Sequence, residues 1–329
     1  MRFEYGTSSG NLDRKVYYNG GGLLAPSGQF SVTVSSLSPG TTYYYRAVLQ
    51  DGSKVCYGQV RSFKTLAAQQ EQQAGWLELP ATSSRSNCVQ GHFGSGKTRN
   101  YSYFYDKGNY APLWEAYPLT AGHTNGDNKS ETWYFNPNVD QNCQIDVRGG
   151  SYPSTYGADS YTRGHMIPAA DRTHTAQARK EVFYLTNQVP QNGDMNNGVW
   201  KSLEEAVRAQ TLQTDTVYVV TGACFRKAGG SENITYLENS SATPKRVPVP
   251  NYLWKVVLKV KRSSGGTVTS ASAVGFWMEN RNYTDDFTAH AVSVDQIEVW
   301  TGFDFFPNLP DTLEASAESN SSWSSFQQF

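Results

Sequence analysis

Alternation of apolar and polar residues predicts short β-strands near the start of the chain. Residues 30–34 read FSVTV and place their apolar side chains on one face, because successive side chains of a strand point to opposite sides. The Pro-Gly pair at 39–40 is typical of a turn, and TYYYRA at 42–47 alternates again. Gly52 marks a further turn, after which the alternation continues. Residues 1–66 are therefore predicted to form an all-β module.

A later strand pattern combines an apolar face with a basic one. In the run WKVVLKVK at 254–261, the apolar face is formed by every second residue, whereas Lys255, Lys259 and Lys261 point the other way. A solvated strand face is one interpretation of these charges. The other is the wall of a groove that binds a polyanion, and on that interpretation Lys255 and Lys259 contact nucleic acid.

A helical period follows in the segment NNGVWKSLEEAVRAQT. From Asn197 onward, apolar residues recur at i, i+3 and i+7, at Trp200, Leu203 and Val207. Asn196 lies at the predicted start of this helix, where asparagine is well suited as a cap.

Three polar residues lie along one flank of that helix: Asn196, Glu204 and Arg208. A cap and an i,i+4 ion pair worth about 0.2–0.5 kcal/mol would explain them structurally. Alternatively they form a cation site, in which the amide oxygen is a ligand and the carboxylate holds the metal's water molecules. The helical pattern alone is compatible with both interpretations.

The segment YTRGHMIPAADR at 161–172 suits neither a central strand nor a helix, because it places Gly and Pro within a few residues. It also concentrates two arginines, a histidine and an aspartate, which indicates either an irregular loop or a functional site. An imidazole titrates near ~6.5, so His165 is a candidate general base. Arg163 offers a guanidinium group for phosphate, and Arg172 is a further candidate for contacting nucleic acid.

Composition and charge narrow the class of protein. Hydrophobic residues make up 38% of the 329 residues and aromatic residues 13%, which supports a folded core. The formal net charge of −1 indicates no overall basic field, so positive charge for a polyanion must be local. No apolar run approaches the ~20 residues that span a bilayer.

Cysteine spacing and targeting signals add little. Four cysteines occur without CxxC spacing, which argues against a zinc site and leaves one or two disulfides of undetermined pairing open. The N-terminal MRFEYGTSSG lacks the apolar centre of a signal peptide. The polar, turn-rich composition with few Lys and Glu nevertheless predicts a secreted or otherwise extracytoplasmic protein.

Several motifs in order carry a family resemblance. TRGHMIPAAD, FYLTNQVPQ, NNGVWKSLEEAVR, VYVVTG, VPVPNYLWKVV and EVWTGFDFFPNLP resemble the signature of the DNA/RNA non-specific endonucleases, over residues 76–310. The resemblance implies a ββα-metal core in an α+β domain, with a mainly antiparallel sheet flanked by helices. It implies hydrolysis of DNA and RNA. One departure is Thr162, since the best-known form of the family has Asp before Arg-Gly-His.

The resemblance also implies roles for individual residues. His165 is expected to be the general base, and Asn196 the ligand of Mg²⁺, with Mn²⁺ or another divalent cation as the alternative. Glu204 is expected to orient the metal's water molecules. Arg163 and Arg208 are expected to bind phosphate, and Asn187 to organise the histidine loop.

The N-terminal module has a resemblance of its own. LSPGTTYYYRA and the later GQVRSFKT resemble the last strands of a fibronectin type III domain, without its first strands or core tryptophan. The chain is therefore expected to begin inside a longer protein. The predicted organisation is an incomplete module at 1–66, a linker at 67–75, the nuclease domain at 76–310 and a Ser-rich flexible tail at 311–329.

Two other functions are compatible with the same residues. In the first, the metal and histidine cleave smaller nucleotides or another phosphate ester. In the second, the scaffold is catalytically silent and serves as a surface-binding module led by its β-domain.

Overall fold

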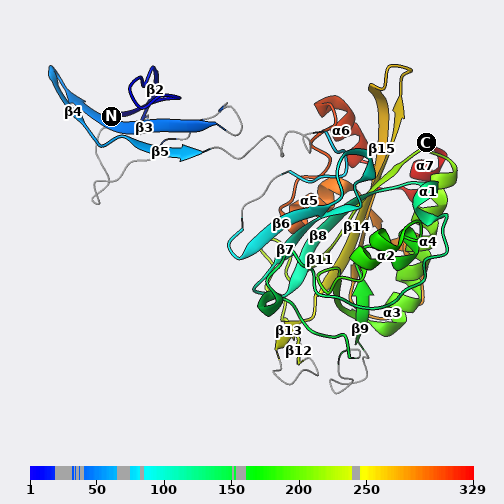
Figure 1. Cartoon of the computed structure of the whole chain (residues 1–329). Helices are drawn as coiled ribbons and strands as arrows, with labels where there is room; N and C mark the ends of the chain where they lie inside the picture. Colours follow the sequence, from blue (N-terminus) through cyan, green and yellow to red (C-terminus); the bar gives the residue numbers. More distant parts are fainter. Residues whose placement is uncertain are drawn as a thin grey trace. The chain divides into compact units, whose positions relative to one another are not determined.

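The chain forms two compact units, Met1–Gly75 and Trp76–Phe329, each with its own contacts. Figure 1 shows the computed structural model of the chain. The structure describes residues 1–18, 32, 34, 37, 41–64, 75–81, 85–149, 152, 161–238 and 245–329. All but Gly75 of the linker predicted at 67–75, and most of the strand predicted at 30–34, lie outside the described residues.

The described residues of the first unit form an antiparallel sheet in the order β2-β1-β3-β4, with β5 paired to β3. Tyr43 and Val48 are fully buried in it. Glu4 is also buried and is held by the guanidinium groups of Arg2 and Arg46, at 2.9 and 2.8 Å. The strands are β1 Arg2–Gly6, β2 Arg14–Tyr17, β3 Thr42–Asp51, β4 Lys54–Tyr57 and β5 Arg61–Lys64.

The second unit is built on a seven-stranded sheet in the order β16-β15-β14-β11-β8-β7-β6, in which every neighbouring pair is antiparallel. Its strands are β6 Cys88–Phe93, β7 Tyr101–Asp106, β8 Ala111–Leu119, β11 Val217–Cys224, β14 Tyr252–Arg262, β15 Val268–Glu279 and β16 Ala291–Val292. Two small two-stranded antiparallel sheets accompany it, β9 Tyr161–His165 with β10 Gln188–Asn192, and β12 Tyr236–Glu238 with β13 Arg246–Pro248.

Helices cover both faces of this sheet (Figure 1). On β15, Phe276 packs against Trp323 of α7, whereas its neighbour Trp277 packs against Trp300 of α5, at ring-centroid distances of 5.6 and 4.7 Å. Adjacent strand residues point to opposite faces, so α7 and α5 lie on opposite sides. The helices are α1 Ala121–Thr124, α2 Ala176–Val182, α3 Gly193–Asn197, α4 Val199–Ala209, α5 Val294–Thr301, α6 Asp311–Glu318 and α7 Trp323–Gln328, with short 3₁₀ turns at 96–98, 141–143, 169–171, 210–212 and 287–290. The predicted α+β architecture is confirmed.

The strand with the predicted basic face is buried on both sides. Lys255 is 1% exposed and lies 5.2 Å from the ring of Trp200 on α4. Lys259 is 2% exposed and lies 4.6 Å from the ring of Phe326 on α7. Alternation marked the strand correctly, but β14 is central in the sheet, and the helices that cover its polar face come from other parts of the chain. The prediction of a solvated or nucleic-acid-binding lysine face is therefore wrong for these two residues.

The C-terminal tail is ordered, contrary to the prediction of a flexible segment. Its two helices, α6 and α7, bury Ala317, Trp323 and Phe326. Trp323 and Phe326 share one face of α7 because they are three residues apart. The many serines occupy the other face, and this is why composition alone suggested a mobile tail.

Two further expectations concern membranes and cysteines. No described helix combines the length and apolar character needed to cross a membrane. All four cysteines carry free thiols, and Cys224 is buried.

Candidate active site

The strand pair β9–β10 and the helices α3 and α4 form a ββα unit on one face of the central sheet (Figure 1). In this pair, His165 lies opposite Gln188 and Arg163 opposite Pro190. Gly164 is required between them, because a Cβ at this position would lie 2.4 Å from Cβ of Gln191. The Arg-Gly-His motif is therefore a strand end, with the arginine and histidine on one face and the glycine packed on the other.

His165 is enclosed by aromatic rings. The ring centroids of Trp133 and Phe183 lie 4.7 and 4.9 Å from the imidazole, and Phe183 meets it edge-on. Nε2 of the histidine is buried and has no hydrogen-bond partner among the described residues. The pKa of His165 is lowered to about 3, chiefly by burial and also by the positive charges of the nearby Arg179 and Arg163. The imidazole is therefore neutral at physiological pH, as a proton acceptor must be.

Asn187 fixes the backbone that follows His165. Its amide oxygen accepts a hydrogen bond from the N–H of Ile167 at 2.8 Å. Its amide nitrogen donates to the carbonyls of Ile167 and Val182, at 3.2 and 2.7 Å. The side chain is fully buried, and its hydrogen bonds all go to the backbone. Asn187 is therefore placed to organise the histidine loop through the backbone.

The periodicity predicted Asn196 at the start of the long helix. In the structure it lies in the short helix α3 instead. Helix α4 begins at Val199, after Gly198, where a Cβ would lie 2.7 Å from the carbonyl oxygen of Asp194. The amide nitrogen of Asn196 donates to Oγ1 of Thr162 at 3.2 Å. This contact occupies the nitrogen, and no hydrogen bond of the described residues takes up the amide oxygen, so that oxygen is the available ligand atom.

Thr162 connects Asn196 to the histidine strand. Its hydroxyl accepts from Asn196 and donates to the carbonyl of Gln191 at 3.3 Å. Thr162 precedes His165 by three residues on β9, about 10 Å along an extended strand. The amide and the imidazole thus belong to one rigid unit, and the residue that departs from the family pattern is the one in contact with the predicted metal ligand.

Glu204 lies above a buried polar row of the central sheet. Glu115 on β8, Thr221 on β11 and Lys255 on β14 are direct neighbours in the register, and each is at most 1% exposed. Burial raises the pKa of Glu204, and the positive charge of Lys255 opposes this rise. Burial lowers the pKa of Lys255, whose ammonium nitrogen has no hydrogen-bond partner among the described residues.

Arg208 is held by a buried carboxylate that the sequence reading did not single out. Its Nε lies 2.6 Å from Oδ1 of Asp171, and the other oxygen of Asp171 accepts from the hydroxyl of Tyr117 at 3.0 Å. Arg163 is anchored similarly, because Nη1 donates to the carbonyl of Val147 at 3.1 Å. Both arginines are only partly buried, so each keeps N–H groups that can meet a phosphate.

Arg172 has a structural role, and the prediction that it contacts nucleic acid is wrong. It is fully buried, and its guanidinium donates to the carbonyls of Asn100, Pro118 and Asp171 at 2.8–2.9 Å. Lys255 and Lys259 are buried as well, so they do not contact nucleic acid either. In each case a charged side chain was assigned to the surface because its type is usually exposed, whereas its packing partners are distant in sequence.

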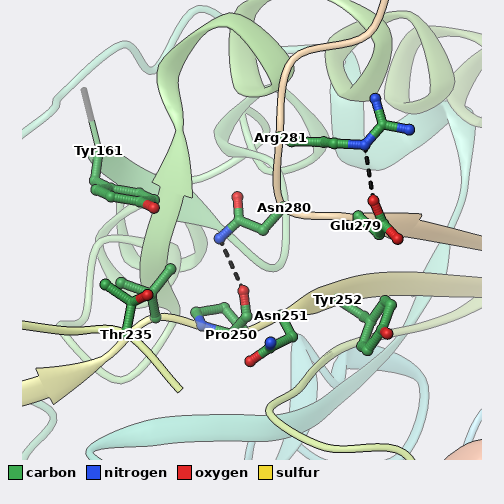
Figure 2. A pocket seen from close by; sticks show the side chains of 9 residues that line it. Tyr161, Thr235, Pro250, Asn251, Tyr252, Glu279, Asn280 and Arg281 are labelled. Carbon is green, nitrogen blue, oxygen red and sulfur yellow. Dashed lines mark hydrogen bonds and ion pairs between the residues drawn. The ribbon is translucent and has the colours of Figure 1, made fainter. Parts of the chain in front are cut away.

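Asn280, immediately after β15, connects the central sheet to the strand pair β9–β10. Its side chain accepts from the N–H of Asn192 at 2.8 Å and donates to the carbonyls of Pro190 and Pro250 at 2.9 and 3.1 Å. It lies in the wall of a polar cavity of about 260 Å³ that Tyr161 and Arg281 also line (Figure 2). No sequence pattern marked Asn280 or Trp133, because neither belongs to a motif. The residues that each of them contacts at the site are distant in the sequence.

Comparison with known proteins shows which proteins the chain resembles. The profile of the DNA/RNA non-specific endonucleases matches residues 86–312. A nuclease of Nostoc sp. is 32% identical over 174 residues, which are 51% of this chain and 58% of that protein. Human mitochondrial nuclease EXOG is 28% identical over 244 residues, 72% of this chain and 61% of that protein. The chain thus spans about three fifths of each relative.

A solved structure supports the fold. The crystal structure of the EndoG/EndoGI complex contains a chain that superposes with a TM-score of 0.53, at 23% identity, covering 74% of this chain and 93% of that one. The prediction of a secreted or extracytoplasmic protein is wrong, because the relatives include several named as mitochondrial nucleases. The composition that suggested it reflects a strand- and turn-rich fold and not a compartment. By the extent of the profile match, the chain belongs to the DNA/RNA non-specific endonuclease family.

Proposed function

We propose that this protein is a metal-dependent, sugar-non-specific endonuclease that hydrolyses phosphodiester bonds of DNA and RNA. The observation that carries the proposal is the ββα unit. It brings a neutral, half-buried imidazole, an amide oxygen free to bind a cation and two anchored arginines onto one strand pair and its adjoining helices.

His165 is the general base in this proposal. Its low pKa keeps it unprotonated, and the phosphate of a bound substrate offsets the positive charge of Arg163 and Arg179 that disfavours protonation. The imidazole then becomes a stronger base when the substrate is present. Trp133 and Phe183 restrict the ring to one orientation, and Asn187 fixes the backbone behind it.

Asn196 would hold the metal, and the site fits Mg²⁺. This ion binds few protein oxygens and keeps several water molecules, so one amide ligand is sufficient. A bound divalent cation supplies charge neutralisation at the phosphate and at the leaving oxygen. Glu204, eight residues further on, would orient the water molecules of the cation, and the positive charge would favour its ionised form. Mn²⁺ or another divalent cation is an alternative with the same oxygen ligands.

Arg163 and Arg208 would bind phosphate oxygens, which carry no information on base or sugar. A site that recognises only phosphates does not distinguish DNA from RNA, since the 2′-hydroxyl is not read. This accounts for a lack of sugar selectivity in the proposal.

The N-terminal unit is proposed to be a fibronectin type III-like module that precedes the nuclease domain. Its support is the antiparallel sheet around β3, the strand that carries the resemblance, with Tyr43 packed on Phe63 at a ring-centroid distance of 6.0 Å. On this division the nuclease domain follows the linker at 67–75, and it includes α6 and α7.

The test is cleavage of plasmid DNA, single-stranded RNA and a dinucleotide by the full chain in Mg²⁺. We expect the two polymers to be cleaved, EDTA to abolish cleavage, and His165→Ala to be slower by at least ~10²-fold, the effect of losing a positioned base. His92→Ala, which removes an exposed histidine on β6, is the matched control. If the wild-type protein cleaves the polymers no faster than His165→Ala does, the proposal that this protein is an enzyme is refuted. Cleavage of the dinucleotide but of neither polymer would favour the alternative function, hydrolysis of smaller nucleotides.

A further inference from the structure

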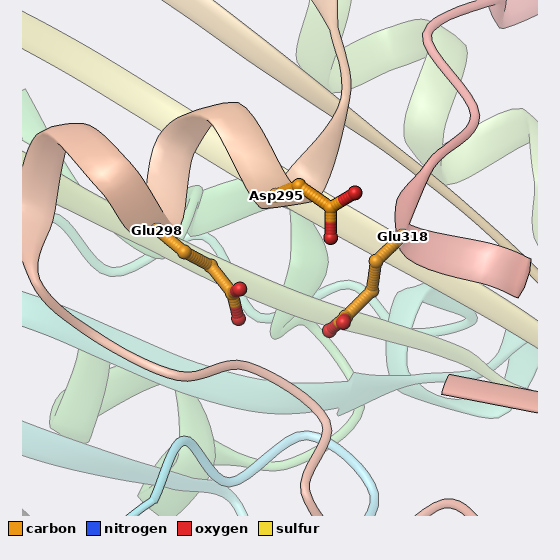
Figure 3. Close-up of side chains that lie close together, drawn as sticks. All are labelled: Asp295, Glu298 and Glu318. Atoms are coloured by element: carbon orange, nitrogen blue, oxygen red, sulfur yellow. The ribbon is translucent and has the colours of Figure 1, made fainter. Parts of the chain in front are cut away.

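Three carboxylates from two helices meet on the face of the sheet opposite the candidate active site. Asp295 and Glu298 project from one side of α5, three residues apart, and Glu318 ends α6 (Figure 3). One oxygen of each can be chosen such that all three lie within 4.8 Å of one another. No ion pair among the described residues includes any of them.

Glu318 is the member of this cluster that points to a missing partner. Its residue is 5% exposed, yet Oε1 is buried and has no hydrogen-bond partner among the described residues. A buried carboxylate oxygen without a partner is costly. The position adds to this cost, because the C-terminal end of α6 carries the negative end of the helix dipole. Figure 3 shows the side chain directed toward the other two carboxylates.

The helices that carry the cluster are held firmly. Helix α5 packs closely on the sheet at Gly275, where a Cβ would lie 2.6 Å from Cδ1 of Ile297. Oε1 of Glu298 accepts from the N–H of Phe305 at 2.7 Å, which fixes that carboxylate and leaves its second oxygen available. The exposed Asp295 leaves the cluster open to solvent on one side, so an ion can enter.

We propose that Asp295, Glu298 and Glu318 bind a Ca²⁺ ion that fastens α6 to α5, separate from the catalytic metal. All ligands are oxygens, which hard cations prefer. Two oxygens on opposite sides of Ca²⁺ are about 4.6–5.2 Å apart, so oxygens within 4.8 Å of one another are close enough to share this ion. Mg²⁺ demands a stricter octahedral geometry and gives up its water molecules reluctantly, so a site of three protein carboxylates suits Ca²⁺ better. Water molecules complete the coordination on the side of Asp295.

The test is calcium titration of the chelator-treated full chain by calorimetry. All proteins carry Asn196→Ala, so that the candidate catalytic metal does not contribute. We expect this background to bind one Ca²⁺ with a Kd below about 1 mM. Adding Glu318→Gln should weaken binding at least tenfold. Adding Glu205→Gln, which removes an exposed carboxylate on α4, should leave it unchanged.

Thermal unfolding gives a second readout that does not depend on activity. At about 100 times the Kd, Ca²⁺ should raise the Tm of the background protein by about 5 °C, and Glu318→Gln should lose this rise. Without Ca²⁺, Glu318→Gln should unfold at a temperature no lower than the background, because it removes an unpaired buried carboxylate. A background protein that binds no Ca²⁺ at 10 mM (about ten times that limiting Kd), or a Glu318→Gln protein that binds as the control does, would overturn the site. Neither result bears on cleavage by His165 and Asn196.

Discussion

The contact between Thr162 and Asn196 gives a quantitative prediction about the metal. Replacing Thr162 with Val keeps the shape of the side chain but removes the hydroxyl that accepts from the amide nitrogen of Asn196 at 3.2 Å and donates to the carbonyl of Gln191 at 3.3 Å. Without this partner, the amide can rotate and its oxygen no longer points in one direction. We expect weaker metal binding with the catalytic groups unchanged.

The magnitude follows from one neutral hydrogen bond. Such a bond contributes about 0.5–1.5 kcal/mol net. Because 1.4 kcal/mol is a factor of ten, the Mg²⁺ concentration for half-maximal cleavage should rise about 2- to 12-fold. The rate at saturating Mg²⁺ should stay near that of the wild type, since His165 and both arginines are untouched.

The assay is the initial rate of plasmid cleavage as a function of Mg²⁺ concentration. Thr162→Ser should restore the wild-type value, because serine retains the hydroxyl. Thr269→Val is the matched control, since it removes a comparable hydroxyl bond, to the carbonyl of Lys261 at 3.2 Å, on the remote strand β15. An unchanged Mg²⁺ dependence in Thr162→Val would refute the reasoning. A lower maximal rate with an unchanged Mg²⁺ concentration for half-maximal cleavage would refute it too.

Three further predictions concern the tail, the histidine and the buried lysine. Trp323→Ala should lower the free energy of unfolding, measured by urea denaturation, by about 3–5 kcal/mol, because it empties a buried site against Phe276. Gln328→Ala, on the exposed face of the same helix, should change this free energy little. A loss below ~1 kcal/mol in Trp323→Ala would fit a mobile tail instead. The pKa of His165 is lowered to about 3 in the folded protein, so between pH 3 and pH ~6.5 the unfolded chain binds more protons than the folded one. The stability that the neutral imidazole contributes above pH ~6.5 is therefore lost as the pH falls. Between pH 7 and pH 5 the wild type should therefore lose about 2 kcal/mol more than His165→Gln, and equal losses would show that the imidazole is not buried. Lys259→Met should leave the slope of log affinity for DNA against log salt concentration unchanged, whereas loss of a phosphate-contacting lysine would reduce that slope by about 1.

The sequence alone determined what depends on local pattern. The alternation at 254–261 marked β14, and the period of Trp200, Leu203 and Val207 marked α4, because each element's own side chains create its apolar face. The motif at 161–165 marked a candidate site, because its arginine and histidine lie close together in the sequence, and the structure places it on β9.

Only the tertiary structure decided what depends on packing between distant segments. Lys255 is buried because α4 covers it, and Trp323 is ordered because β15 offers it Phe276. The contact of Asn196 with Thr162 and the meeting of Glu318 with α5 likewise join elements that no periodicity relates. Burial and partnership belong to the neighbours that a residue acquires on folding, and a strand or helix pattern records only which of its own sides is apolar.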